Sequence, residues 1–202
     1  MARSRSQDEV RRRYRWRART YDLICRPLYA RVRRAATTRI ATFLREQGAA
    51  RPTVLEIGCG TGLNLRALHG VLPRARLVGV DLSQDMLRRN RGTMGHLVQG
   101  DTGCLRDGQA DVVLLSFVVA VAPEGIALLD EAKRLLKPSG LLVLVDSGRF
   151  VGAWRWLNPL LGPLISWSGQ AELDLAWQGC EADTHCLGGM ARLAAMRKRP
   201  EA

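Results

Sequence analysis

Residues 53–64 read Thr-Val-Leu-Glu-Ile-Gly-Cys-Gly-Thr-Gly-Leu-Asn, a short apolar run followed by a glycine-rich turn. Gly58, Gly60 and Gly62 stand at alternate positions, and a helical spacing of leucines begins directly after them. Glycine reaches positive φ and lets a ligand lie against bare backbone. The helix that follows offers free N–H groups and the positive end of its dipole. The stretch therefore predicts a strand, a turn and a helix start able to bind a carboxylate or a phosphate.

An acidic residue ends the next apolar run. Asp81 follows residues 77–80 and lies nineteen positions after Gly62. Its carboxylate can accept two hydrogen bonds, which suits the vicinal hydroxyls of a ribose. It could also cap the helix expected to start near Ser83, although Ser83 is itself a good cap. The pair predicts a nucleoside site, with a tight turn that holds no ligand as the alternative.

The spacing of the turn separates two kinds of nucleotide site. A dinucleotide fingerprint, Gly-x-Gly-x-x-Gly, would need a glycine where Leu63 stands. The pattern present is Glu56-x-Gly58-x-Gly60-x-Gly62, which resembles the first motif of the class I S-adenosylmethionine-dependent methyltransferases. In that family the loop holds the amino-acid end of the cofactor.

Two further segments resemble motifs of the same family. In residues 81–87, Leu82 and Met86 would flank the adenine, although Met86 alone also fits a core position. In residues 99–102, Asp101 would contact the adenine amino group, although Gly-Asp is also a common turn pair. The resemblance implies S-adenosyl-L-methionine as cofactor and the following binding residues: Glu56, Gly58, Gly60, Gly62, Asp81, Leu82, Met86, Asp101, Thr102 and Ser116.

The acceptor side is less clearly marked. Residues 110–117 predict a buried strand that ends beside the reacting methyl, near Ser116. Many relatives carry a histidine after this strand, whereas this chain continues Val-Val-Ala-Val-Ala-Pro. Asp146, at the end of the strand expected at 140–146, is the acid that we place near the acceptor, as a candidate base. Residues 16–22 resemble a signature of the quinone and phospholipid methyltransferase branch, in which Tyr21 would close over the cofactor; a core tyrosine is the alternative.

Charge is concentrated in one part of the chain. The formal net charge is +12, and residues 1–51 hold 15 arginines against four acidic residues. Residues 52–202 hold 16 basic and 15 acidic residues, so the catalytic part is nearly neutral. Arginines alternate with aromatic residues over 11–19, which predicts contact with an anionic surface, with a solvated helix face as the alternative. Five scattered cysteines and three histidines indicate neither a disulfide framework nor a metal site.

Residues 150–167 contain three of the five tryptophans together with Pro159 and Pro163. Trp rings favour a membrane–water interface, and the prolines break any long helix. An insertion at this point lies above the strand ends, where a substrate would enter. We therefore predict a Trp-rich cap over residues 149–170, for which a packed cap without ligand contact is the alternative.

The alternation of strand and helix patterns predicts an α/β fold, and the resemblance implies that it is a Rossmann-like class I methyltransferase fold. Its central, mostly parallel, seven-stranded sheet would have helices on both faces. Residues 1–50 would form a basic helical arm and cap, and residues 51–202 the methyltransferase domain. The resemblance adds an antiparallel final strand. The expected strands are 53–57, 76–80, 96–99, 111–116, 140–146, 180–186 and 190–197, and the expected helices are 5–19, 28–48, 62–70, 83–92 and 124–136.

The function predicted from these features is methyl transfer from S-adenosylmethionine to a small-molecule or lipid acceptor. The basic arm and the cap favour N-methylation of a phosphatidylethanolamine-type headgroup at an anionic membrane. Alternatives are C- or O-methylation of a quinone precursor or apolar natural product, and a nucleic-acid-binding protein or methyltransferase, which the lack of a base-flipping motif disfavours. The charged start of the sequence predicts no secretory signal, and hence a cytoplasmic protein, peripheral on the inner membrane face.

Overall fold

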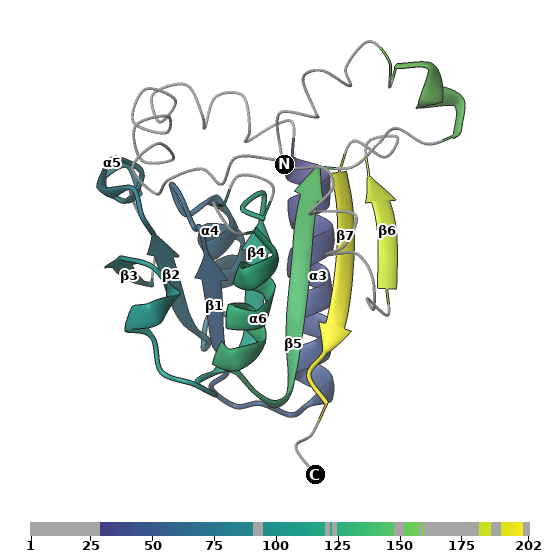
Figure 1. Cartoon of the computed structure of the whole chain (residues 1–202). Helices are drawn as coiled ribbons and strands as arrows, with labels where there is room; N and C mark the ends of the chain where they lie inside the picture. Colours follow the sequence, from purple (N-terminus) through teal and green to yellow (C-terminus); the bar gives the residue numbers. More distant parts are fainter. Residues whose placement is uncertain are drawn as a thin grey trace.

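The computed structural model describes residues 29–90, 95–119, 122, 125–147, 152–157, 159, 182–186 and 191–199. Seven strands form one sheet in the order β3-β2-β1-β4-β5-β7-β6 (Figure 1). The first five pair in parallel, whereas β7 runs antiparallel to both of its neighbours. The strands are β1 (Thr53–Ile57), β2 (Arg76–Asp81), β3 (His96–Gln99), β4 (Ala110–Ser116), β5 (Leu136–Ser147), β6 (Ala182–Cys186) and β7 (Ala191–Arg197).

The central strands are apolar on both faces because helices cover both faces of a parallel sheet. In β4 the five residues from Val112 to Ser116 include four that are fully buried. The buried apolar residues of β1, β2, β4, β5 and β7 divide between two core clusters, one on each side of the sheet. Because β1, β4 and β5 carry apolar residues on both faces, they occupy the middle of the sheet.

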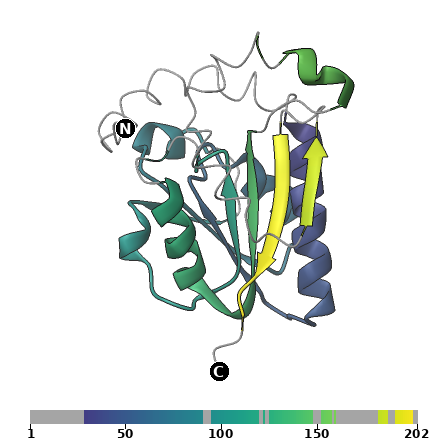
Figure 2. The same cartoon turned by 45° about the vertical axis from the view of Figure 1, so that its right-hand side comes forward.

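Helices α3 (Ala30–Glu46) and α4 (Leu63–Val71) pack on one face of the sheet. Helix α6 (Gly125–Leu135) packs on the other. Figure 2 shows the sheet between α3 and α6. Short segments complete the described chain: α5 (Gln84–Leu87) and the 3-10 helices η1 (Thr102–Cys104) and η2 (Gly152–Leu157).

The α/β fold with a mostly parallel, seven-stranded sheet and an antiparallel strand is confirmed. Two boundaries were wrong. The helix expected at 83–92 ends at Leu87: Arg88 N still bonds to a carbonyl four residues back, whereas Arg89 N and Asn90 N bond to carbonyls only three residues back. Strand β5 begins at Leu136 rather than 140, because Leu136 pairs with Ala110 ahead of a register shift in the β4–β5 ladder.

The helix expected at 5–19 and most of the cap expected at 149–170 lie outside the described residues. Within 149–170 the structure describes η2 and Pro159. Among the described helices, none combines the length and the apolar character needed to cross a bilayer.

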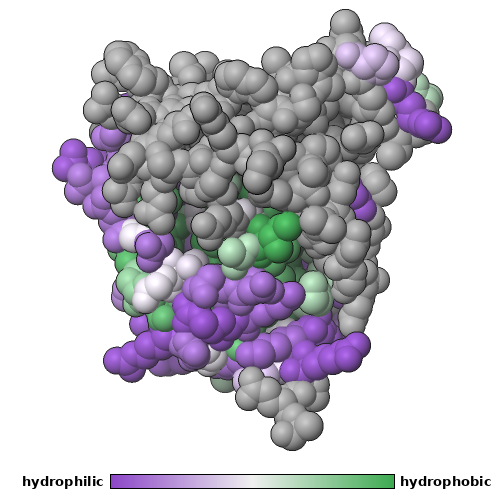
Figure 3. All heavy atoms as spheres, in the orientation of Figure 1, coloured by the Kyte–Doolittle hydropathy of each residue, from purple (hydrophilic) through white to green (hydrophobic). Residues whose placement is uncertain are grey.

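The carboxyl ends of β1, β2, β3, β4 and β5 meet at one edge of the sheet, where the first turns of α3 also lie (Figure 1). The opposite edge is strongly hydrophilic in the view of Figure 3. In open α/β sheets ligands bind beyond the carboxyl ends of the strands. The fold therefore directs attention to the upper edge in Figure 1.

Candidate functional site

The glycine turn after β1 closes against the end of β2. Gly58 N and Cys59 N both donate to Val80 O, at 2.7 and 3.1 Å. All three glycines of the turn have a positive φ, between +53° and +75°. A Cβ on Gly58 would lie 2.6 Å from Cγ2 of Val118. A side chain is therefore excluded here both by backbone conformation and by space.

The Cys59 side chain lies beneath the turn. It is 5% exposed, and a Cβ on Gly79 would lie 2.7 Å from its Sγ and 2.7 Å from Cδ1 of Leu65. Burial raises the pKa of the Cys59 thiol. The glycine within β2 thus makes the room in which Cys59 packs between β2 and α4.

Asp81 connects the turn to the end of β2. Its Oδ2 accepts a hydrogen bond from Gly60 N and its Oδ1 accepts one from Ser83 N, both at 2.7 Å. Burial raises the pKa of Asp81, and the two N–H donors oppose that rise. The helix cap is Ser83 itself, whose Oγ accepts from Met86 N at 3.4 Å. Each Asp81 oxygen retains a lone pair for a further donor, such as a ribose hydroxyl.

A pocket opens beside the turn, between α3 and the ends of β4 and β5. It is lined by Tyr29, Val32, Arg33, Ala36, Gly58, Cys59, Gly60, Thr61, Leu63, Asn64, Ser116, Phe117 and Val145. The rings of Tyr29 and Phe117 lie with centroids 4.2 Å apart at an interplanar angle of 38°. Phe117 has a φ of +54°, which is strained for a bulky residue, and its N donates to Val145 O at 2.7 Å.

Glu56 is buried next to this pocket, at 1% exposure. Its Oε1 accepts a hydrogen bond from Asn64 Nδ2 at 2.6 Å, and Asn64 Oδ1 accepts one from Arg33 Nε at 3.2 Å. Among the described residues, Glu56 Oε2 has no hydrogen-bond partner. Burial raises the pKa of Glu56 to about 8. The site thus holds an acid that is mostly protonated at neutral pH and able to gain a further donor or a cation.

The residues predicted to hold adenine lie along the same edge. Leu82 is half-buried and Met86 is 2% exposed, with its Cε 3.9 Å from where a Cβ on Gly60 would lie. Asp101 is exposed, and its Oδ1 accepts from Gly103 N at 3.0 Å, which caps η1. Thr102 is buried. Gly58, Gly60 and Ser116 therefore share the pocket, while these four residues lie outside its lining.

This chain is similar to known proteins in both sequence and fold. Residues 55–144 match the profile of a family described as a methyltransferase domain. The chain is 34% identical over 95 residues to trans-aconitate 2-methyltransferase of Azoarcus sp., covering 46% of this chain and 38% of that protein. It is 26% identical over 162 residues to demethylmenaquinone methyltransferase of Listeria monocytogenes, covering 71% of this chain and 66% of that protein. The chain therefore spans no more than about two thirds of the length of these relatives.

Solved structures share the fold. The plantazolicin methyltransferase BpumL in complex with SAH has a TM-score of 0.64 at 15% identity, over 89% of this chain and 88% of that one. A SAM-dependent methyltransferase from Aquifex aeolicus has a TM-score of 0.54 at 18% identity, over 78% and 89%. Residues 55–144 are thus similar to a methyltransferase domain, and the chain shares the fold of these methyltransferases.

One of these structures holds SAH, and the residues present here fit the S-adenosylmethionine that the sequence predicts as cofactor. The glycine turn exposes backbone, Asp81 faces the same edge, and the buried Glu56 has an oxygen to offer. When bound, the cofactor supplies a methyl group on a sulfonium that is already reactive. The protein's share is to align an acceptor with that methyl and to exclude water.

Of the two predicted catalytic residues, Asp146 is not in the pocket lining and Tyr21 cannot be placed from the described residues. Asp146 of β5 is 1% exposed and pairs in register with Arg192 of β7. Successive residues of a strand face opposite sides, so Asp146 lies on the other face of β5 from Val145, which lines the pocket. A base role for Asp146 stays a prediction. Tyr21 lies outside the described residues.

Sequence reasoning missed most of the pocket lining, including the large or polar side chains of Tyr29, Arg33, Asn64 and Phe117. Asn64 had a signal, since it directly follows the glycine turn in the deciding stretch. Arg33 had a weaker one, because it stands three residues before Ala36 and seven before Ile40, on the buried side of α3. The contact of Tyr29 with Phe117 depends on the packing of α3 against the sheet, which no local pattern records.

Proposed function

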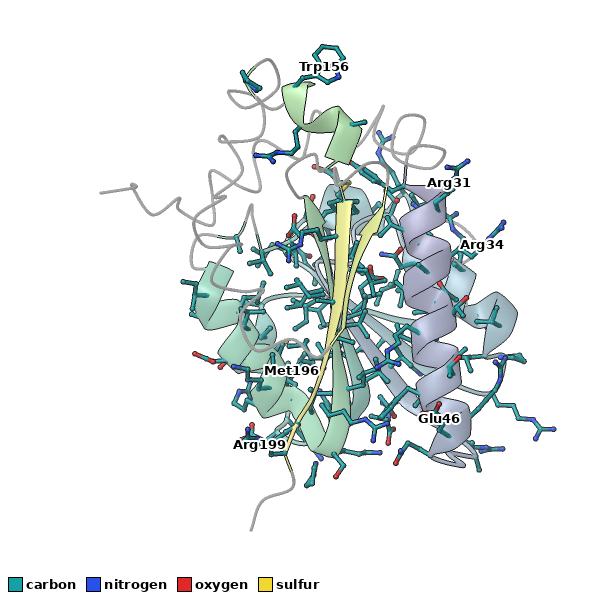
Figure 4. The ribbon with its side chains drawn as sticks, turned by 90° about the vertical axis from the view of Figure 1, so that its right-hand side faces the viewer. Arg31, Arg34, Glu46, Trp156, Met196 and Arg199 are labelled. Atoms are coloured by element: carbon teal, nitrogen blue, oxygen red, sulfur yellow. The ribbon has the colours of Figure 1, made fainter. Side chains whose placement is uncertain are left out.

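We propose that the protein transfers a methyl group from S-adenosylmethionine to the amine of a phospholipid headgroup of the phosphatidylethanolamine type, at the surface of an anionic membrane. The observation that carries this proposal is a basic and aromatic surface at the pocket end of the molecule. It consists of Arg31, Arg34, Arg155 and Trp156. Figure 4 shows Arg31, Arg34 and Trp156 at this end, with Glu46 and Arg199 at the opposite end.

The side chains of this surface are exposed. Arg31 and Arg34 lie on the outer side of the first turns of α3, and Trp156 of η2 is 68% exposed. A basic residue close to an anionic leaflet contributes about 1 kcal/mol to binding. Tryptophan favours the interface between headgroups and acyl chains. A membrane held here would bring lipid headgroups to the carboxyl edge of the sheet, where the pocket opens.

The basic arm at 1–50 and the Trp-rich cap at 149–170 extend this surface in our proposal. Their composition supports it, since the arm carries most of the chain's net positive charge and the cap three of its tryptophans. Both segments would meet lipid, and Tyr21 of the arm would close over the cofactor.

The acceptor atom is inferred from the pocket lining. Among the described residues that line the pocket there is no histidine, aspartate or glutamate. An amine can lose its proton before it binds, so it needs no side-chain base, whereas carbon and oxygen acceptors usually do. The rings of Tyr29 and Phe117 also suit a nitrogen that gains positive charge as it is methylated, because aromatic faces attract cations.

The test uses purified protein, S-adenosylmethionine labelled in its methyl group, and vesicles of phosphatidylethanolamine with and without phosphatidylglycerol. We expect label in the extracted lipid, and faster transfer on vesicles that contain the anionic lipid. Label confined to water-soluble products would overturn the lipid assignment. Asp81→Asn, which weakens the anchor of the glycine turn, serves as the low-activity control.

Vesicle binding can be tested separately from catalysis. Arg31→Ser combined with Trp156→Ser should weaken co-sedimentation with anionic vesicles, by about fivefold for the arginine alone. Arg45→Ser, an exposed change in the last turn of α3 at the opposite end, is the matched control. Equal loss in both variants would mean that the pocket end is not the membrane-facing end.

One specific observation favours a second candidate, C-methylation of a quinone precursor. The relative from Listeria monocytogenes is a demethylmenaquinone methyltransferase, and the match covers 71% of this chain. Supplying a demethylated quinone and phosphatidylethanolamine in the same reaction would separate the two acceptors by where the label appears.

A further inference from the structure

We propose that a groove at the edge where β1 and β2 begin binds a partner protein, through an acidic segment that carries an aliphatic side chain at its centre. The groove lies between the last turns of α3 and α4, at the end of α3 where Figure 4 shows Glu46. It shares no lining residue with the pocket beside the glycine turn. A partner bound here would therefore leave that pocket open, and its binding goes beyond the methyl transfer proposed above.

The groove is formed by two helix ends and by the connections that follow them. Its volume is about 490 Å³, within the range of ligand-binding clefts, about 300–1,000 Å³. Nine of its eleven described lining residues are glycine, alanine, valine, leucine or proline, and the other two are Arg45 and Arg74. The groove thus offers aliphatic contact and two guanidinium groups to whatever lies in it.

The aliphatic part has a buried floor and an exposed wall. Leu44 is 2% exposed and Pro52 is buried, whereas Val71, in the last turn of α4, is 43% exposed. Val71 is one of only four large apolar side chains that are exposed in the described part of the chain. An apolar side chain inserted here would remove this aliphatic surface from water, which favours binding.

Four arginines surround this aliphatic surface. Arg51 stands beside Pro52 in the sequence, and Arg76 N donates to Pro52 O at 2.8 Å, so both adjoin the groove that Arg45 and Arg74 line. All four arginines are exposed, and none forms an ion pair with another described residue. Four unpaired positive charges around one groove favour an acidic ligand.

The acids at this end of the molecule are already paired. Glu46 Oε2 lies 3.7 Å from Arg197 Nη2, and Asp111 accepts hydrogen bonds from Lys137 Nζ at 2.9 Å. They are therefore engaged with other cations and leave the four arginines of the groove without an acidic partner among the described residues.

The two helix ends do not reverse this charge. The carboxyl end of a helix carries partial negative charge on its last carbonyls. Here the last carbonyls of α3 and α4 accept hydrogen bonds from the amides of Gln47, Gly48, Ala49 and Leu72, at 2.8–3.3 Å. The full charges of the arginines therefore set the sign of the surface.

The lining favours a protein segment over other anions. It contains no aromatic side chain among its described residues, whereas single-stranded nucleic acid is usually held by stacking on aromatic rings. A bilayer surface is flat, whereas a recess between two helix ends receives a protruding side chain. An apolar centre with arginines around it is typical of protein–protein interfaces.

The test uses the full chain labelled with ¹⁵N and three peptides as probes. The first peptide has two central leucines between pairs of glutamates, the second has glutamine in place of glutamate, and the third has serine in place of leucine. We expect the first to shift the amide resonances of residues 44–50 and 71–76, and the other two to bind at least tenfold more weakly. Equal binding of either altered peptide, or shifts confined to other residues, would overturn the proposal.

A pair of variants tests the charges directly. Arg45→Glu combined with Arg74→Glu should weaken binding of the acidic peptide at least tenfold. Arg88→Glu combined with Arg89→Glu makes the same change of charge at two exposed arginines elsewhere, and it should alter binding less than twofold. Equal weakening in both variants would contradict a site at the groove. The comparison of peptides on wild-type protein decides the matter if the first variant does not fold.

Two other occupants would give distinct results. Shifts of the groove amides by an oligothymidylate, but not by the acidic peptide, would replace the proposal with a nucleic-acid site. Shifts that appear with rising protein concentration alone would replace it with a contact between two copies of the chain. All of these measurements are made without cofactor, so a negative result would leave the proposed methyl transfer untouched.

Discussion

Two arginines organise two polar clusters on opposite faces of the sheet, and the clusters differ in how completely they are satisfied. Arg134 of α6 donates to the carbonyls of Thr102 and Leu105, at 3.0 and 3.2 Å, and forms ion pairs with Glu131 and Asp107. Arg33 of α3 reaches Glu56 through an amide and leaves a buried carboxyl oxygen without a described partner.

The two acids in these clusters respond in opposite directions. The hydrogen bond from Arg134 lowers the pKa of Glu131, whereas burial raises the pKa of Glu56 to about 8. The cluster around Arg134 joins η1 to α6, is partly exposed, and has its hydrogen-bonding groups paired within the protein. A buried acid with an open oxygen is typical of a functional site, where environments are arranged to shift a pKa. From this comparison we infer that the Arg134 cluster stabilises the fold, and we expect the Glu56 cluster to be the one that meets a ligand.

The largest expected effect is on the free energy of unfolding; it arises from Glu56 and depends on pH. The pKa of Glu56 is about 8 in the folded protein and 4.5 ordinarily, so the folded state keeps a proton that the unfolded chain releases. The free energy of unfolding should therefore fall as pH rises from about 4.5 to about 8. Glu56→Gln removes this titration and should be more stable than wild type at pH 8.5 by a few kcal/mol, with little difference at pH 5.

Urea unfolding at both pH values measures this effect. The pKa of Asp81 is also raised, so some pH dependence should persist in Glu56→Gln, and the difference between the two proteins isolates Glu56. A parallel loss of stability with pH in both proteins would mean that Glu56 is ionised in the folded state.

The next effect is on the Arg134 side. Arg134→Met removes two bonds to backbone carbonyls and two ion pairs, and we expect it to lower the free energy of unfolding by about 1–3 kcal/mol. Cofactor affinity should change little. Urea midpoints and calorimetry on the same samples would check both, with Lys133→Met, whose ion pair with Asp130 is exposed, as the control. If Arg134→Met changed cofactor affinity more than the free energy of unfolding, the Arg134 cluster would not be purely structural.

The smallest expected effect is a change in stability at Ser139, which lies away from both clusters. Ser139 has a φ of +62° in the turn between the two parts of β5. Such a conformation costs an L-residue about 1–2 kcal/mol relative to glycine. Ser139→Gly relieves this strain, but glycine loses more backbone entropy on folding, so the free energy of unfolding should rise by a net of only about 0.5 kcal/mol. Ser139→Ala, which keeps the strained conformation, should give no gain in urea unfolding.

Sequence reasoning recovered what depends on local pattern. The glycine turn, Asp81 and the parallel strands follow from spacing within single segments, and the structure has these segments at one edge. The length of α5 was overestimated, because residues 88–91 (Arg-Arg-Asn-Arg) bring no apolar side chain that could pack a further helical turn against the sheet. Asp146 ends the expected strand, but the face it occupies depends on strand alternation, which end-of-strand position alone does not give. Arg33 and Phe117 join the site only through the packing of α3 on the sheet.

The buried position of Cys59 has a practical consequence. A thiol wedged under the glycine turn, with a raised pKa, is a poor nucleophile toward alkylating reagents as long as the turn stays closed. Cys104 is exposed and supplies a reference for unhindered labelling in the same molecule. The rate at which Cys59 is alkylated, relative to Cys104, should therefore report how often the glycine turn opens.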